Sequence, residues 1–220
     1  MNDRDPAFVT QAVAIIELLL SPPKDGPLCC VDDTPGIGVR RPTVPDQPPA
    51  LGRPARREFE YVRNGTVDLL AGFGVNDGQV CGIVRLQHRS REFCELLGLL
   101  DQQTPLGQPI HLILDPVSSH HSAEVRSWLD AHADRTFVFY FLPVHASWLS
   151  FIEVWFSILS RKCLKRADFP DVLTATRQIE AFITTYNTHL AHPFAWRKGV
   201  RFYQRLKDKL AVRQALPEAA

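Results

Sequence analysis

The chain has 220 residues, of which 45% are hydrophobic and 22% charged, and 25 basic residues nearly balance 24 acidic ones to leave a net charge of +1. These values are those of an ordinary folded domain, and they exclude intrinsic disorder, a collagen-like repeat and a disulfide-rich scaffold. Five cysteines without paired spacing predict reduced thiols, as in a cytoplasmic protein.

The first predicted element is an amphipathic helix over residues 7–20. It is short and contains Glu17, so neither a signal peptide nor a membrane span fits it. A compact apolar strand follows and closes on two acids, Asp32 and Asp33. The stretch from Thr34 to Arg57 is rich in proline and arginine and shows no periodic pattern of apolar residues, which predicts a long basic loop. A loop of that length inside a compact domain usually has a function.

The middle of the chain predicts alternating strands and helices. Residues 66–86 indicate a hairpin that turns through Asn76–Gly78. Ser90 is expected to cap a helix with apolar residues at intervals of three and four. The apolar strand "IHLILD" then ends on Asp115, and after a further helix comes the strand "FVFYFL" at residues 137–142.

Two long helical patterns follow Pro143, over residues 148–166 and 171–187. Trp148 and Trp155 are seven positions apart in the first pattern, which favours a place in the core for both. The order of elements predicts an α/β fold with a mixed five-stranded sheet flanked by helices, antiparallel on one side and parallel on the other.

Three acids stand where an ionised carboxylate is costly: Asp32 and Asp115 close apolar strands, and Glu153 interrupts an apolar helix. Neighbouring strands would bring the two aspartates together, and a helix across the sheet would add Glu153. Such a cluster suits two Mg²⁺ or Mn²⁺ ions roughly 4 Å apart and therefore phosphoryl transfer. The alternative is that these carboxylates bind no metal and are simply solvated, Asp32 and Asp115 at the ends of their strands and Glu153 at an outward position of its helix. Strand alternation points Asp33 to the opposite face from Asp32.

Several stretches together carry a family resemblance: "CVDDTPGI", "EYVRNGTVDLLAGF", "HRSREF", "HLILDPVSSH", "ASWLSFIEVWFSILSRK" and "IEAFITTYN". From about Leu28 to about Val200 the chain resembles the ribonuclease H-like catalytic domain of DDE transposases, specifically bacterial insertion-sequence transposases related to the mariner group. The resemblance implies that Asp32, Asp115 and Glu153 are the catalytic residues and the ligands of two Mg²⁺ or Mn²⁺ ions. The implied reaction is DNA strand cleavage and strand transfer during transposition.

The resemblance also implies a domain organisation and partners. Residues 1–24 would be an N-terminal helix and linker, a remnant without a DNA-reading module. Residues 25–195 would form the catalytic domain, and residues 196–220 a basic C-terminal tail. DNA is the expected partner, at transposon ends and at the target. A homodimer and a separate helix-turn-helix polypeptide are further candidate partners. The expected localisation is the bacterial cytoplasm, in association with the nucleoid. No association with a membrane is expected.

Candidate DNA contacts are a histidine that matches a family histidine and basic residues from two clusters: His120, Arg161, Lys162, Lys165, Arg197, Lys198 and Arg201. The alternatives are a solvated helix face for each cluster and packing at a helix start for His120. A competing reading of the whole chain is a truncated, inactive remnant that binds DNA or a partner transposase. Pro116, where the family usually has asparagine, and the missing recognition helices favour that reading, while the three acids oppose it.

Overall fold

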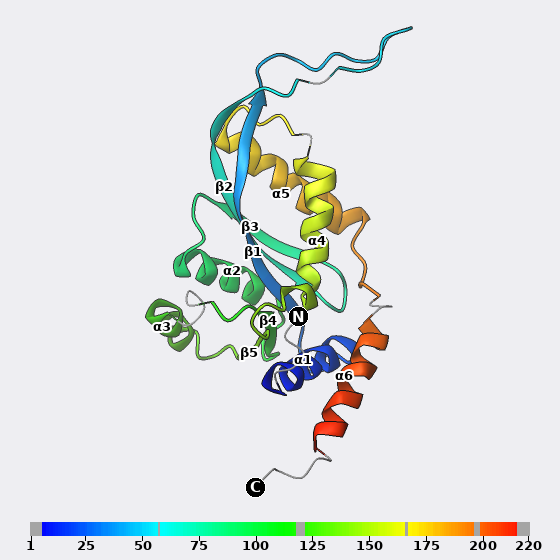
Figure 1. Cartoon of the computed structure of the whole chain (residues 1–220). Coiled ribbons are helices and arrows are strands. Elements are labelled where there is room, and N and C mark those ends of the chain that lie inside the picture. Colours follow the sequence, from blue (N-terminus) through cyan, green and yellow to red (C-terminus); the bar gives the residue numbers. More distant parts are fainter. Residues whose placement is uncertain (1–5, 57, 118–121, 166, 196–198, 215–220) are drawn as a thin grey trace.

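A computed structural model describes residues 6–56, 58–117, 122–165, 167–195 and 199–214. Its centre is a five-stranded sheet in the order β3-β2-β1-β4-β5 (Figure 1). The strands are β1 (Leu28–Pro42), β2 (Tyr61–Gly74), β3 (Val80–Arg85), β4 (Ile110–Leu114) and β5 (Phe137–Phe141). β1 to β3 are joined in antiparallel pairs, whereas β1, β4 and β5 run parallel. The predicted mixed five-stranded sheet is confirmed.

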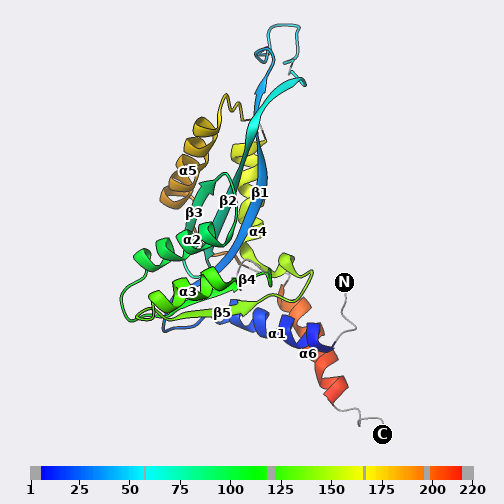
Figure 2. The same ribbon diagram turned by 90° about the vertical axis from the view of Figure 1, so that its left-hand side faces the viewer.

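Helices cover both faces of this sheet (Figures 1 and 2). They are α1 (Pro6–Leu20), α2 (Ser90–Gln103), α3 (Ala123–Ala131), α4 (Phe151–Leu159), α5 (Val172–His189) and α6 (Gly199–Gln214), with the short turns η2 (Ser147–Leu149) and η3 (Ser160–Leu164). α1, α4 and α5 contribute to one hydrophobic core, and α2 and α3 to a second core on the other face. Every residue of β4 is buried, as expected for a strand covered on both sides.

β1 is longer than the sequence predicts, and this corrects the expected loop from Thr34 to Arg57. Residues as far as Pro42 belong to the strand, although its pairing with β2 shifts register between Thr34 and Ile37. Gly36 lies in that shift with a φ of 67°, which glycine adopts without strain. Such a bulge accommodates a proline because the ladder bond is already interrupted there.

Beyond the strand pair, residues 43–60 form an arm that projects from the rest of the molecule (Figure 1). The arm is a hairpin closed by bridges between Gln47 and Arg56 and between Ala50 and Arg53. Its described residues are exposed except for the half-buried Glu58. The predicted loop is therefore partly strand and partly an exposed hairpin.

The helical patterns also need corrections. The region predicted as one helix, residues 148–166, consists of the 3₁₀ turn η2, the α-helix α4 and the π-helical turn η3. Trp155 is fully buried, as predicted, but Trp148 is 40% exposed and stacks edge-on against Phe202 of α6. The residue that caps α2 is Arg89, whose backbone N–H donates to Glu92, and Ser90 is the first helical residue.

The expected C-terminal tail contains the helix α6, which packs against α1. The Tyr203 hydroxyl donates to the Glu17 carboxylate at 2.6 Å, and Lys207 lies 3.4 Å from the same group.

The helix α5 is attached to β3, the strand at one edge of the sheet. The side chain of Asn187 accepts a hydrogen bond from the backbone N–H of Val80 and donates one to the backbone carbonyl of Val80. The last part of α5 is thus fixed to the edge strand β3. Within the described residues, none of the helices combines the length and the hydropathy needed to cross a membrane.

Candidate active site

The parallel pairing of β1 with the end of β4 brings Asp32 and Asp115 next to each other. The parallel register pairs Val31 with Leu114, and each aspartate is the next residue of its chain. Neighbouring strands are about 4.8 Å apart. Because side chains alternate along a strand, Asp32 shares its face with Cys30, and Asp115 shares its face with Ile113. Cys30 and Ile113 belong to the same core, beneath α4, so both carboxylates lie on the side that α4 covers.

α4 brings Glu153 to the same place. Its buried side, which includes Ile152 and Trp155, packs into the core that contains Cys30. The backbone amides of Phe151 and Ile152 at the start of the helix point at the Cys30 thiol, two residues before Asp32. Glu153 lies in this first turn, half-buried. The helix therefore begins directly above the part of β1 that contains Cys30 and Asp32.

The electrostatics of Asp32 show how close the three acids lie. Burial raises the pKa of Asp32 to about 7, although the Asp33 backbone N–H donates to its carboxylate at 2.8 Å. Asp115, Asp33 and Glu153 each raise this pKa further by charge repulsion. Burial also raises the pKa of Asp115. The charges that act most strongly on Asp32 are therefore all carboxylates, and holding all of them ionised requires positive charge.

Divalent cations would fit this donor set. The side chains of Asp32, Asp115 and Glu153 offer only carboxylate oxygens, which are the ligands that Mg²⁺ and Mn²⁺ prefer. Within the part of the chain that the structure describes, no three His, Cys, Asp or Glu side chains are already close enough to hold one ion. Small rotations of side chains on neighbouring elements would be needed, and bound cations would offset the repulsion that now acts on Asp32.

A second polar cluster lies on the opposite face, at the same edge of the sheet. Asp68 of β2 accepts from the backbone N–H of Gly36 at 2.7 Å, and its other oxygen lies 2.6 Å from Nδ1 of His88. Asp33 points to this side, as alternation predicts, and its pKa is raised by burial and by Asp68 while His88 lowers it. Asp68 and His88 were not predicted from the sequence. An acid between Val67 and Leu69, inside an apolar strand, was the available signal.

The loop between β5 and α4 contains a strained residue. His145 has a φ of 64°, the only positive φ of a non-glycine residue in the described ranges. Its side chain is exposed, and the loop follows the carboxyl end of β5, on the same edge of the sheet as Asp115. Strain of this kind concentrates near functional sites.

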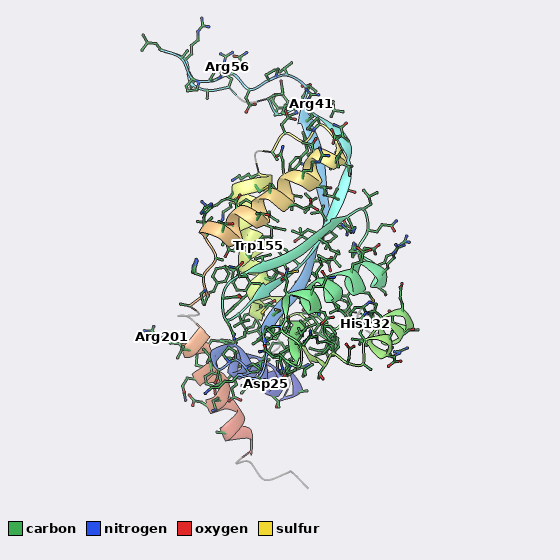
Figure 3. All side chains as sticks on the ribbon, turned by 180° about the vertical axis from the view of Figure 1, so that it is seen from behind. Asp25, Arg41, Arg56, His132, Trp155 and Arg201 are labelled. Atoms are coloured by element: carbon green, nitrogen blue, oxygen red, sulfur yellow. The ribbon has the colours of Figure 1, made fainter. Side chains whose placement is uncertain are left out.

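The predicted DNA contacts are scattered over the molecule. Arg161, Lys162 and Lys165 are exposed in and after η3, which is at the far end of α4 from Glu153, towards the arm. Arg201 is exposed on α6, at the other end of the molecule from Arg56 of the arm (Figure 3). The remaining three candidates lie outside the described residues: His120, Arg197 and Lys198. The structure therefore gathers the three acids but not the basic residues.

Comparisons with known proteins agree with this arrangement. A family model described as DDE superfamily endonuclease matches residues 27–175. A search of curated proteins finds no match. Among solved structures, the Mos1 strand transfer complex is similar with a TM-score of 0.60 at 13% identity, covering 96% of this chain and 62% of that chain.

Two further structures are similar in the same way. The catalytic domain of Mos1 mariner transposase gives a TM-score of 0.57 at 10% identity and covers 99% of this chain and 98% of that chain. The Mos1 mariner paired end complex with Mn gives a TM-score of 0.55 at 16% identity, and the match covers 99% of this chain and 65% of that chain. The chain thus spans less than two thirds of the Mos1 chains in these complexes. At such identities the likeness shows the fold.

Proposed function

Because the chain belongs to the DDE superfamily endonucleases, we propose that it is a transposase catalytic domain that cleaves DNA strands and joins them to target DNA with Mg²⁺ or Mn²⁺. Its fold is the ribonuclease H-like fold expected from the sequence. The observation that carries the proposal is the charge repulsion that Asp115 and Glu153 exert on the half-buried Asp32, since a protein rarely gathers partly buried carboxylates without a use for them.

In this proposal the three acids are the metal ligands. Asp32 would hold the ions from within β1, Asp115 from the end of the neighbouring strand β4, and Glu153 from the first turn of α4. The bound cations would activate the attacking oxygen and stabilise the leaving oxygen of a phosphodiester. The sheet and α4 hold the carboxylates in place, and Asp32 must lose the proton that its raised pKa favours before it can act as a ligand.

DNA would contact the protein through exposed basic groups. Arg53 and Arg56 of the arm and Arg161 and Lys162 of η3 are all exposed, and each could neutralise a backbone phosphate. Sequence-specific recognition of transposon ends, a homodimer and a separate helix-turn-helix polypeptide are further parts of the proposal. The insertion-sequence context and an association with the bacterial nucleoid belong to it as well.

Nicking of supercoiled plasmid tests the proposal. We expect the protein to nick plasmid in the presence of Mg²⁺ or Mn²⁺, and the Asp115→Asn and Glu153→Gln variants to lose at least about 100-fold in rate. Asp134→Asn is the matched control, because Asp134 is exposed in the loop before β5, at the opposite edge of the sheet. Equal nicking by the Asp115→Asn and unmodified proteins, or no nicking by either with any metal, would reject catalysis and leave a DNA-binding or partner-binding remnant.

A further inference from the structure

The cluster of Asp68 and His88 has no part in the metal chemistry proposed above, yet its geometry is that of an oriented functional imidazole. Asp68 is only 8% exposed, and both of its oxygens are engaged, one by the Gly36 backbone N–H and one by Nδ1 of His88. The carboxylate therefore fixes the orientation of the histidine ring, as it does in many active sites.

The second nitrogen of this ring is available to a ligand. Nε2 is on the far side of the ring from Nδ1, and the side chain of His88 is 47% exposed. No residue of the described ranges forms a hydrogen bond with Nε2. An imidazole that is oriented on one side and exposed on the other presents a fixed N–H donor to the solvent.

His88 is at the same edge of the sheet as the three acids. It follows β3, which runs parallel to β1 because each of them is antiparallel to β2. β3 is two strands away from β1, a spacing of about 10 Å. Asp33 connects the two clusters, since its carboxylate interacts electrostatically with His88 and with Asp115. A ligand that reaches from Asp115, past the carboxyl end of β4, to His88, past the carboxyl end of β3, would meet both clusters.

His88 can carry a positive charge toward its exposed side. The pKa of His88 is raised by its hydrogen bond with Asp68 and by the charges of Asp33, Asp68 and Glu92. Arg89 and Arg91, both exposed, adjoin it in sequence. The helix α2 begins at Ser90, and its N-terminal end adds positive potential.

We propose that His88, oriented by Asp68, binds a backbone phosphate of the DNA strand whose scissile phosphate lies at Asp32, Asp115 and Glu153. This inference rests on the proposed function. One strand of duplex DNA carries a phosphate about every 3.4 Å of its axis, so a strand placed at the acids has other phosphates at roughly the 10–15 Å that separates β3 from β1 and β4. His88 is then a positioning residue, which holds the strand on the side of the sheet opposite to α4.

The test uses the His88→Asn variant, whose amide can keep the hydrogen bond to Asp68 but has no donor in the place of Nε2 and no charge. The measurement is the affinity for a short fluorescent DNA duplex in Ca²⁺, at several salt concentrations. We expect the affinity to fall about 3- to 10-fold and the slope of log affinity against log salt to fall by about one. In plasmid nicking, KM should rise while kcat changes little.

His192→Asn is the matched control, because His192 is exposed beside the turn between β2 and β3, at the opposite edge of the sheet. It should leave the affinity and the salt slope unchanged. If thermal unfolding shows that His88→Asn is not folded, His88→Ala replaces it with the same expected loss of affinity.

The outcomes separate this inference from the proposed function. If the unmodified protein binds and nicks DNA and the folded His88 variant does so with the same affinity and salt slope, His88 only fixes the loop before α2 and the inference is wrong. If the unmodified protein neither binds nor nicks DNA, the proposed function and this inference are both wrong.

Discussion

The carboxylate of Asp32 is half-buried near other carboxylates, and burial raises its pKa to about 7. An aspartate in an unfolded chain has a pKa near 3.9. Between these two values the folded protein binds more protons than the unfolded chain does. The free energy of unfolding therefore falls as the pH rises from about 4 to about 7. Asp32 thus lowers the stability of the metal-free protein at neutral and alkaline pH.

We expect Asp32→Asn to remove this penalty. At pH 8 in EDTA the variant should unfold with a free energy about 1–3 kcal/mol higher than that of the unmodified protein, and at pH 4 the two should agree within about 0.5 kcal/mol. Denaturant unfolding at both pH values measures the difference. Asp134→Asn, at an exposed position, should give no pH-dependent change. An equal effect of Asp32→Asn at both pH values would contradict the assigned pKa.

Arg135 is a second residue whose role can be tested by itself. Its side chain is 5% exposed, forms an ion pair with Asp101 and donates to the backbone carbonyls of Thr104, Pro105 and Gln108. It fixes the connection between α2 and β4, the strand that ends at Asp115.

Arg135→Ala should lower the free energy of unfolding by about 3–5 kcal/mol, since it leaves several buried acceptors without a donor. Arg135→Lys should recover only part of this, because an ammonium group cannot reproduce the planar set of donors. The control is Arg91→Ala, which removes a 78% exposed side chain 3.8 Å from Glu95 and should cost no more than about 0.5 kcal/mol. Equal losses for the two alanine variants would mean that Arg135 does not organise this connection.

At the scale of secondary structure, the loop between β5 and α4 determines where α4 begins, and its strain is a testable property. His145→Gly should raise the free energy of unfolding by about 0.5–1 kcal/mol, because glycine adopts the positive φ without steric cost. Val144→Gly, in the same turn but without a positive φ, should lower it by a similar amount. Thermal unfolding of both variants gives the comparison, and a loss of stability in both would show that His145 is not strained.

The elements themselves were largely predictable from local patterns. Local patterns correctly identified the helix over residues 7–20 and the hairpin of β2 and β3. They also identified β1 and β4, the two parallel strands that position Asp32 and Asp115. The extension of β1 was missed because Pro35 and Gly36 signal a loop locally, whereas pairing with β2 absorbs them in a bulge. The interruption of the predicted helix over residues 148–166 depends on packing against other elements, which no local pattern contains.

The site was predictable to a similar extent. Asp32 and Asp115 could be paired from the sequence because each closes an apolar run of residues, and the strand order then made them neighbours. The position of Glu153 relative to them required the packing of α4 as well. His88 and Asp68 are 20 residues apart and meet only through the fold, so no spacing rule pointed to the pair.

At the scale of the whole molecule, the arm of residues 43–60 is separate from the folded body. Thr43 and Glu60 are joined by a backbone hydrogen bond of 3.1 Å, so an Asn-Gly turn could replace residues 44–59. We expect this deletion to change the free energy of unfolding by no more than about 1 kcal/mol, because no described residue of the arm belongs to either core.

The same deletion should weaken DNA binding and reduce its salt dependence, since it removes the exposed Arg53 and Arg56. Fluorescence anisotropy with a DNA duplex measures both quantities. Double replacement of these two arginines by alanine in the full-length arm is the control for charge alone. A shortened protein that is folded and binds DNA as tightly as the original would exclude the arm from the DNA interface.

The central claim is that carboxylates from β1, from the end of β4 and from α4 converge on shared metal ions. Anomalous X-ray diffraction from a crystal soaked in MnCl₂ tests it most directly. We predict two manganese peaks about 4 Å apart, between the side chains of Asp32, Asp115 and Glu153, and their absence from crystals of the Asp115→Asn variant. Manganese bound only elsewhere, or Glu153 turned away from the two aspartates in the soaked crystal, would contradict the account.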